Sequence, residues 1–169
     1  MQIETERLLI REMIASDLEH LLKIYGTPVN MKFIPNSNCD WSLDKLREKY
    51  EKANCNYSLG FGIFTVVDKQ TKAIIGEAGL FNSFQDLKHL ELGYILDKKF
   101  WGLGYGTEVC NALINYGFEK LKLEKLTARM IAANTASARL AEKCGMKLID
   151  KGTTDTGVHF LGYETNKPS

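Results

Sequence analysis

Three glycines at alternate positions, Gly102, Gly104 and Gly106, separate two segments of different periodicity. Residues 88–97 alternate apolar and polar side chains, which is typical of a strand. Beyond the glycines, apolar residues recur at the spacing of one helix face, namely Cys110, Leu113, Ile114 and Phe118. The sequence therefore predicts a strand, a tight turn over 102–106 and then a helix.

This turn has the features of an anion-binding site. The first N–H groups of a helix have no partner within the helix, and they lie at the positive end of its dipole. A phosphate or pyrophosphate fits such a site. The spacing and the missing lysine exclude a Walker A loop, and G-x-G-x-G in the second half of the chain differs from the dinucleotide fingerprint. By itself, the turn is also compatible with a connection that binds no ligand.

The remaining periodicity predicts a chain that mixes strands and helices. An S-x-x-E pattern beginning at Ser16 is a capping box that opens a helix, which Gly26 ends, and Ser42 caps a second helix. Residues 27–40 contain Pro28 and Pro35 and are predicted to form a loop. The other predicted elements are a helix over 134–144 and strands over 3–11, 61–67, 73–81, 125–132, 147–150 and 158–164.

The strands at 61–67 and 73–81 are joined by a short polar turn, so they predict an antiparallel hairpin. We therefore expect an α/β fold of the α+β type with a mixed, mostly antiparallel sheet. A chain of 169 residues has the length of one domain, and no linker or repeat divides it. A single domain over residues 1–169 is expected.

Charge and cysteine content narrow the function classes. The 22 basic and 21 acidic residues give a net charge of +1, which argues against a nucleic-acid partner. The start of the chain lacks the apolar segment of a secretory signal, and no stretch is long and apolar enough for a membrane helix. The four cysteines and three histidines show no metal-ligand spacing. We expect a cytoplasmic protein with no metal and no membrane partner.

Five segments of the chain resemble segments of the GNAT superfamily of acyl-CoA-dependent N-acetyltransferases, and they occur in the order in which that superfamily has them. The residues from Trp101 to Glu108 look like the W-G-x-G-Y-x-T-E variant found in the branch of ribosomal-protein N-acetyltransferases, with Trp101 where most members have Gln or Arg. The other similar segments are Glu4–Arg11, Ile75–Leu80, Glu91–Tyr94 and Asn134–Met146. The resemblance implies the GNAT fold, with about seven strands flanked by about four helices, and acetyl-CoA as the co-substrate.

The resemblance also implies where acetyl-CoA binds. Backbone amides from Leu103 to Thr107 would hold the pyrophosphate, and the strand edge at Tyr94 to Leu96 would pair with the pantetheine arm. Asn134 caps its helix and would contact the pantetheine, whereas Arg139 either approaches the phosphates or lies on a solvated face. The candidate cofactor-binding residues are Tyr94, Ile95, Leu96, Trp101, Gly102, Leu103, Gly104, Tyr105, Gly106, Thr107, Asn134, Ser137 and Arg139.

Acetyl transfer from a thioester to an amine needs a proton acceptor, an oxyanion donor and a proton source for the thiolate. Glu91 is the candidate base, directly or through water, although an ordinary solvent-facing carboxylate is an equal alternative from the sequence alone. A backbone N–H near Tyr94 or Ile95 is the candidate oxyanion donor. Many superfamily members use a helix tyrosine to protonate the thiolate; that position is Ala141 here, so Ser137 is the candidate substitute.

The sequence leaves the acceptor open. By resemblance, residues 27–60, including Phe33, Trp41 and Tyr57, and the turn at 152–157 would recognise it. A protein N-terminal amine, a small-molecule amine such as a polyamine or amino acid, and an antibiotic amine all remain candidates. A non-catalytic acyl-CoA sensor is the alternative function, and the protein is expected to be a monomer or a homodimer.

Overall fold

The structure is a computed structural model that describes residues 2–34 and 40–168. Among these described residues, eight strands form one sheet in the order β1-β2-β3-β4-β5-β6-β8-β7, in which only β5 and β6 pair in parallel. The mixed, mostly antiparallel sheet is confirmed. The strands are β1 (Gln2–Glu4), β2 (Leu8–Glu12), β3 (Gly62–Asp68), β4 (Ile74–Asp86), β5 (His89–Leu96), β6 (Lys125–Ile131), β7 (Lys147–Thr153) and β8 (His159–Asn166).

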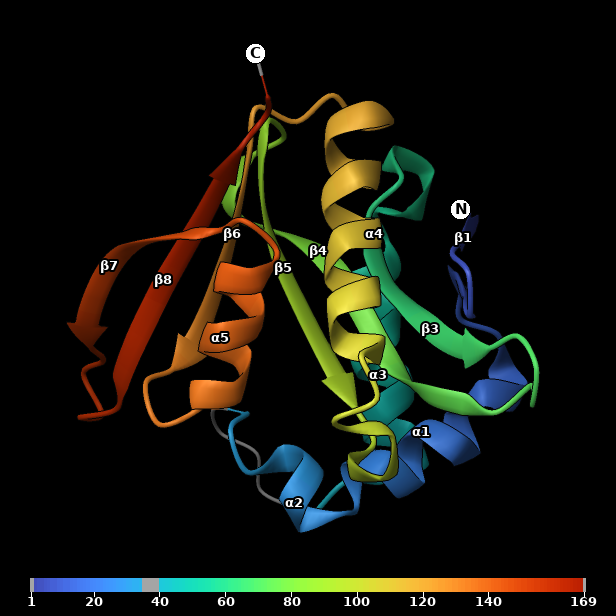
Figure 1. The fold of residues 1–169 in the computed structure, drawn as a ribbon. Helices are drawn as coiled ribbons and strands as arrows, with labels where there is room; N and C mark the ends of the chain where they lie inside the picture. Colours follow the sequence, from blue (N-terminus) through green and yellow to red (C-terminus); the bar gives the residue numbers. More distant parts are fainter. Residues whose placement is uncertain (1, 35–39, 169) are drawn as a thin grey trace.

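Helices cover both faces of this sheet (Figure 1). The α-helices are α1 (Leu18–Tyr25), α2 (Pro28–Met31), α3 (Leu43–Asn54), α4 (Tyr105–Glu119) and α5 (Thr135–Lys143). Three short 3₁₀ helices, η1 (Ala15–Asp17), η2 (Tyr57–Leu59) and η3 (Lys98–Phe100), complete the connections. Helices α4 and α5 pack on one face, and α1, α2 and α3 pack on the other.

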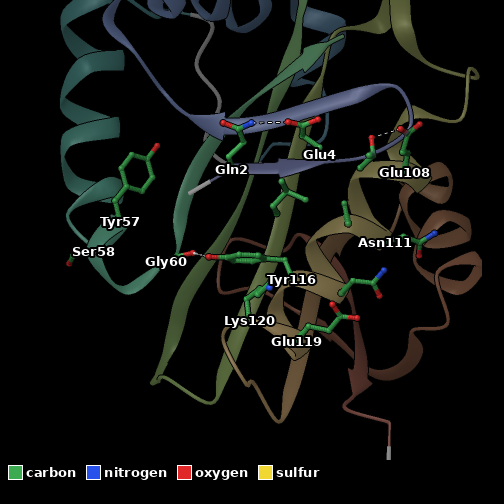
Figure 2. A pocket seen from close by; sticks show the side chains of 14 residues that line it. Gln2, Glu4, Tyr57, Ser58, Gly60, Glu108, Asn111, Tyr116, Glu119 and Lys120 are labelled. Carbon is green, nitrogen blue, oxygen red and sulfur yellow. Dashed lines mark hydrogen bonds between the residues drawn. The ribbon is translucent and has the colours of Figure 1, made fainter.

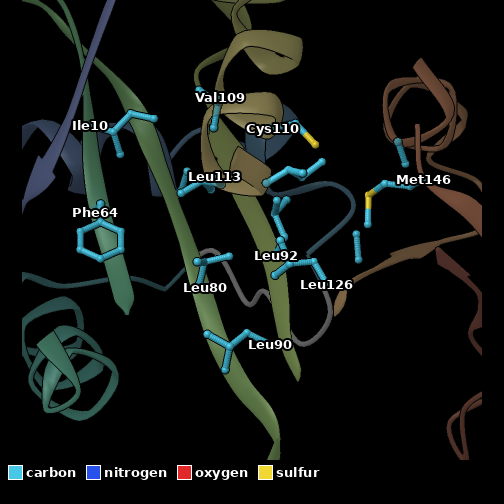
Figure 3. Packing of buried hydrophobic residues seen from close by; sticks show 14 of the residues in the cluster. Ile10, Phe64, Leu80, Leu90, Leu92, Val109, Cys110, Leu113, Leu126 and Met146 are labelled. Carbon is cyan, nitrogen blue, oxygen red and sulfur yellow. The ribbon is translucent and has the colours of Figure 1, made fainter. Parts of the chain in front are cut away.

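Each face has its own core, because successive residues of a strand point to opposite sides. Leu90 and Leu92 of β5 pack with Val109 and Leu113 of α4 in the larger cluster (Figure 3). The predicted apolar face of this helix is confirmed, since Cys110, Leu113, Ile114 and Phe118 are all buried. On the other face, Ile63 of β3 packs with buried residues of α1 and α3.

Three predictions about the N-terminal region were wrong in detail. The expected strand over 3–11 is two antiparallel strands, because the Thr5 hydroxyl accepts from Leu8 N–H at 2.9 Å and closes a turn. This extra strand explains why the sheet has eight strands. Ser16 does not cap α1; it lies inside η1, and α1 begins at Leu18. The loop over 27–40 contains the short helix α2, and its Pro35 lies outside the described residues.

Most other boundaries agree with the sequence to within two residues, but the strand predicted over 73–81 continues to Asp86 and the one predicted over 147–150 continues to Thr153. Gly26 ends α1, and the Ser42 hydroxyl caps α3 by accepting from Lys45 N–H at 3.2 Å. Asn134 caps α5 through its side-chain oxygen, which accepts from Ser137 N–H at 3.2 Å. Each of these helix boundaries is set by residues that are near one another in the chain, so the sequence alone can locate it.

Candidate active site

The two parallel strands at the centre of the sheet diverge. Their ladder begins at His89 and Lys125 and ends at the pair Glu91 and Thr127. Beyond that pair, β5 stays bonded to β4 as far as Leu96, while β6 stays bonded to β8. The edge of β5 that faces β6 is therefore not paired with β6 over residues 92–96, which include Tyr94 to Leu96, where the resemblance implies pairing with the pantetheine arm.

The glycine turn lies just beyond that open edge and starts α4. Gly102 and Gly104 have φ values of 75° and 82°, a left-handed conformation that favours glycine. Gly104 is the N-cap and offers no side chain, and the first bond into the helix joins Glu108 N–H to Gly104 O at 3.1 Å. The N–H groups of residues 105–107 thus remain available to an anion, as the sequence predicts.

Arg7, in the turn between β1 and β2, fixes this glycine turn from outside. Its Nη1 donates to Leu103 O at 2.8 Å, and its guanidinium lies 4.2 Å from the centre of the Tyr105 ring. Glu108 Oε2 accepts from Arg7 Nε at 2.7 Å, and Glu108 Oε1 accepts from Thr5. Although burial works to raise the pKa of Glu108, these hydrogen bonds lower it below its usual value.

Two aromatic residues of the turn have defined partners. Trp101 is 45% exposed and donates its indole N–H to Leu96 O at 2.7 Å, so it closes the open end of β5. The Tyr105 hydroxyl donates to Asp68 Oδ2 at 2.7 Å.

Gly106 has a packing role, because a Cβ there would lie 2.6 Å from Leu140 Cδ1 of α5. Its missing side chain lets α5 approach α4.

Tyr94 and Ser137 meet on the side of the open edge that faces α4 and α5. The Tyr94 hydroxyl donates to Ser137 Oγ at 3.1 Å. Burial raises the pKa of Tyr94 to about 12 despite this hydrogen bond, so the phenol keeps its proton at neutral pH. The inward direction expected for Ser137 is confirmed by this contact. Ala141 is buried one helical turn further along, and Arg139 is exposed.

Glu91 lies on the opposite side of the sheet from Tyr94, as its place in the strand alternation predicts. Its carboxylate accepts from Arg129 Nε at 3.2 Å and from Arg129 Nη2 at 2.9 Å. The Glu91 side chain is 16% exposed, whereas that of Arg129 is 49% exposed. Glu91 is therefore neither fully solvated nor isolated. Nothing in the pattern of β6 marks Arg129, because it occupies an ordinary exposed strand position.

A buried polar cluster that sequence reasoning missed lies on the same face as Glu91. Glu77 of β4 is only 5% exposed and accepts hydrogen bonds from the hydroxyls of Tyr25 and Tyr50. Lys49 Nζ lies 2.7 Å from Glu77 Oε1. Burial, together with the charge of Glu77, raises the pKa of both tyrosines well above the usual value. The cluster joins α1 and α3 to the sheet one strand away from Ile95.

Two of the expected acceptor-binding aromatics have structural contacts. The Tyr57 hydroxyl bonds to the backbone of Met13 and Ile63, and its ring stacks on Phe64 with centroids 5.2 Å apart. Trp41 packs edge-to-face on Tyr25 with centroids 4.7 Å apart, and its buried indole N–H has no partner among the described residues.

A large hollow on the described surface lies elsewhere. It is an open groove of about 920 Å³ between β1, η2 and the far side of α4. Figure 2 shows Tyr116 in this groove, donating to Gly60 O at 2.9 Å. Tyr57 and Glu108 border it, but none of the residues of β5, the glycine turn or α5 considered above does, so the groove is separate from the open edge of β5.

Within residues 2–34 and 40–168, no three His, Cys, Asp or Glu side chains are arranged to hold a metal ion. None of the helices described there has the length and apolar character that crossing a bilayer requires.

Comparisons with known proteins agree with the resemblance in sequence. The sequence model described as an acetyltransferase (GNAT) domain matches residues 7–147. An uncharacterised N-acetyltransferase, p20 of Bacillus licheniformis, is 30% identical over 137 residues, which cover 80% of this chain and 76% of the relative. A GNAT-family acetyltransferase of Bacillus anthracis superposes with a TM-score of 0.86 at 25% identity and covers 98% of both chains.

A ribosomal L7/L12 protein α-N-acetyltransferase, solved in complex with coenzyme A, shares the fold. Its TM-score is also 0.86, at 14% identity, and the match covers 99% of this chain and 98% of the other.

Proposed function

This chain belongs to the GNAT acetyltransferase family and is an acetyl-CoA-dependent N-acetyltransferase, and we propose that it acetylates a primary amine by direct attack within a ternary complex. The observation that carries the proposal is the position of two proton-handling groups on opposite sides of one strand. Glu91 faces one side of the sheet, the Tyr94–Ser137 pair faces the other, and the ladder between β5 and β6 ends beside them.

The residues around the open edge fit acetyl-CoA. The unpaired edge of β5 offers N–H and C=O groups to the amides of the pantetheine arm, and the free N–H groups at the start of α4 suit the pyrophosphate. Asn134 caps α5 and Arg139 lies on the exposed face of that helix, and we propose further coenzyme contacts at both. When bound, acetyl-CoA supplies the thioester carbon to which the amine nitrogen bonds as the carbon–sulfur bond breaks.

The chain's own residues would then move the protons. Glu91 takes the proton that the attacking amine loses, since an α-amine or a lysine is protonated near neutrality, with pKa values of about 8 and about 10.4. A backbone N–H at Tyr94 or Ile95 stabilises the oxyanion. The Tyr94 hydroxyl, acting through Ser137, returns a proton to the leaving thiolate. This route takes the place of the helix tyrosine that many members of the superfamily use, because that position is Ala141 in this chain.

No cysteine is needed as a nucleophile in this scheme. Cys110 is buried on α4, and a hydrogen bond with Cys144 together with burial raises the pKa of its thiol. Raising that pKa disfavours the thiolate, which is the reactive form. Cys110 is therefore poorly suited to form a covalent acyl-enzyme.

A coenzyme-release assay tests the proposal. Wild-type protein is given acetyl-CoA with a panel of peptide N-termini, polyamines, free amino acids and antibiotic amines. We expect release with at least one of them, and a fall of about 100- to 10,000-fold in rate for Glu91→Gln, with acetyl-CoA affinity retained. Tight acetyl-CoA binding without turnover on any amine would favour the sensor function instead. An unchanged rate in Glu91→Gln would show that Glu91 is not the base.

A further inference from the structure

Glu91 and Arg129 form an ion pair at the point where the central ladder ends. Glu91 belongs to the last bonded pair of β5 and β6, and Arg129 lies two residues beyond Thr127 on the same face of β6. The pair bridges the diverging strands on the face opposite to α4 and α5. An acceptor amine that approaches Glu91 from this face therefore also comes close to the Arg129 guanidinium.

Arg129 keeps part of its hydrogen-bonding capacity free. A guanidinium has five N–H donors, and Glu91 engages Nε and one hydrogen of Nη2. Within the described residues nothing accepts from Nη1. The remaining edge of the guanidinium, formed by Nη1 and Nη2, is a planar pair of donors that matches a second carboxylate.

The surroundings hold this donor edge in place and leave space beside it. The Phe84 ring centre lies 5.7 Å from the guanidinium carbon, and the β8 residue opposite Arg129 is Gly162, which adds no side chain and is flanked on β7 by Asp150. The nearest acidic residue of β8 on this face, Glu164, is paired with Lys125 at 3.5 Å. Arg129 is thus fixed on one edge, half exposed, and next to the proposed base.

On the basis of the proposed function, we propose that Arg129 binds the carboxylate of an acceptor whose amine points at Glu91, so that the acceptors are free α-amino acids. An α-amino acid carries both groups on one carbon, which matches the adjacent base and cation. A polyamine would place a second positive charge against Arg129. A peptide N-terminus presents an uncharged amide carbonyl at the same place and so forgoes the charge-assisted pair.

The test compares the twenty common L-amino acids with their carboxamides as acceptors. For the best pair, we expect wild-type kcat/KM to favour the carboxylate by about 10- to 100-fold, the effect of one charge-assisted hydrogen-bonded pair. Arg129→Gln should bring the two values close to equality, and Arg129→Lys should keep part of the preference. The ratio of kcat/KM for the carboxylate to that for the carboxamide is measured within one variant, so a general loss of rate in Arg129→Gln cancels from it.

A second readout separates this inference from the proposed function. N-acetyl-L-amino acids and their carboxamides, which are products of the proposed reaction, are titrated calorimetrically into each variant saturated with coenzyme A. A carboxylate preference that Arg129→Gln abolishes supports the inference, even if no amine is acetylated. Equal affinity for acid and amide in wild type, an unchanged preference in Arg129→Gln, or better turnover of polyamines or peptides would overturn it.

Discussion

Arg7 and Glu108 are separated by 101 positions in the sequence, and Arg7 Nε lies 2.7 Å from Glu108 Oε2. This contact joins two of the segments that resemble the family, Glu4–Arg11 and Trp101–Glu108, into one structure. The N-terminal turn supplies donors through Thr5 and Arg7, and α4 supplies the acceptor. The chain therefore holds its glycine turn in place from a distant segment.

Glu108→Gln tests this arrangement. The amide keeps the shape but loses the charge that three donors satisfy, so the free energy of unfolding should fall by about 1–3 kcal/mol. The KM for acetyl-CoA should rise while the acceptor KM stays constant, because the turn itself is loosened. Urea denaturation and steady-state kinetics measure both effects. Glu119→Gln, at an exposed position of the same helix, is the matched control, and equal behaviour of the two variants would contradict the anchoring role.

The sequence predicts elements well here and contacts between them poorly. Periodicity and caps such as Ser42 and Asn134 depend on neighbours in the chain, so they locate helices and strands. The break in residues 3–11 is a turn closed by Thr5, whose backbone N–H donates to Leu8 O at 3.0 Å and whose hydroxyl accepts from Leu8 N–H, and the alternation continues through it. An alternating pattern therefore does not reveal where one strand becomes two.

The candidate site is predictable only where one segment carries the chemistry. The glycine turn is such a segment. The pair of Glu91 with Arg129 depends on which strands are neighbours, and the pair of Tyr94 with Ser137 depends on where α5 packs on the sheet; neither is a local property of the sequence. Glu77 looks like an exposed strand residue, yet it is buried because Tyr25, Tyr50 and Lys49 satisfy it.

Tyr94→Phe and Ser137→Ala test the proton source. Each change removes one hydroxyl of a bonded pair, so each should lower kcat by about 100-fold, the lower end of the range for general acid catalysis. The double variant should be little worse than either single one, because the two groups act together. Tyr116→Phe, which removes a tyrosine hydroxyl on the far side of α4, should leave kcat unchanged. A normal kcat in Tyr94→Phe would remove Tyr94 from the mechanism.

The pKa of Tyr94 predicts how activity should respond to alkaline pH. Because the pKa of Tyr94 is about 12, its phenol stays protonated through the usual assay range. Activity should therefore show no alkaline loss from this group below about pH 11, within one unit of that value. A kcat profile of the wild type measured against Tyr94→Phe isolates the contribution, and an alkaline limb near pH 9 that vanishes in Tyr94→Phe would contradict it.

Asp68 predicts a loss of stability in acid. Its carboxylate accepts from Thr71 N–H at 2.7 Å and from the hydroxyls of Thr71 and Tyr105, and these bonds lower its pKa to about 2. Since the folded pKa lies below the unfolded value of about 3.9, the stabilisation is complete above pH 4 and is lost as the pH falls toward 2. The stability deficit of Asp68→Asn should thus shrink between pH 5 and pH 2 in urea titrations. A deficit that is constant across this range would exclude the charge as its cause.

Gly104 and Gly106 should fail for different reasons when each is replaced by alanine. Gly104→Ala puts a side chain on a left-handed residue at φ 82°, which costs about 1–2 kcal/mol, and its Cβ would lie 3.3 Å from Arg7 Nη2. Gly106→Ala instead crowds Leu140 and costs about 1–3 kcal/mol by overpacking, partly offset by the better helix propensity of alanine.

Leu140→Ala separates the two causes. Added to Gly106→Ala, it removes the crowding atom, so the double variant should be more stable than the sum of the single changes predicts. Added to Gly104→Ala, it should give only the sum, because backbone strain at residue 104 does not involve α5. Thermal denaturation of the six proteins, with acetyl-CoA KM values, measures both couplings. Equal coupling of Leu140→Ala to both glycine variants would mean that the whole turn, rather than Gly106 alone, depends on contact with α5.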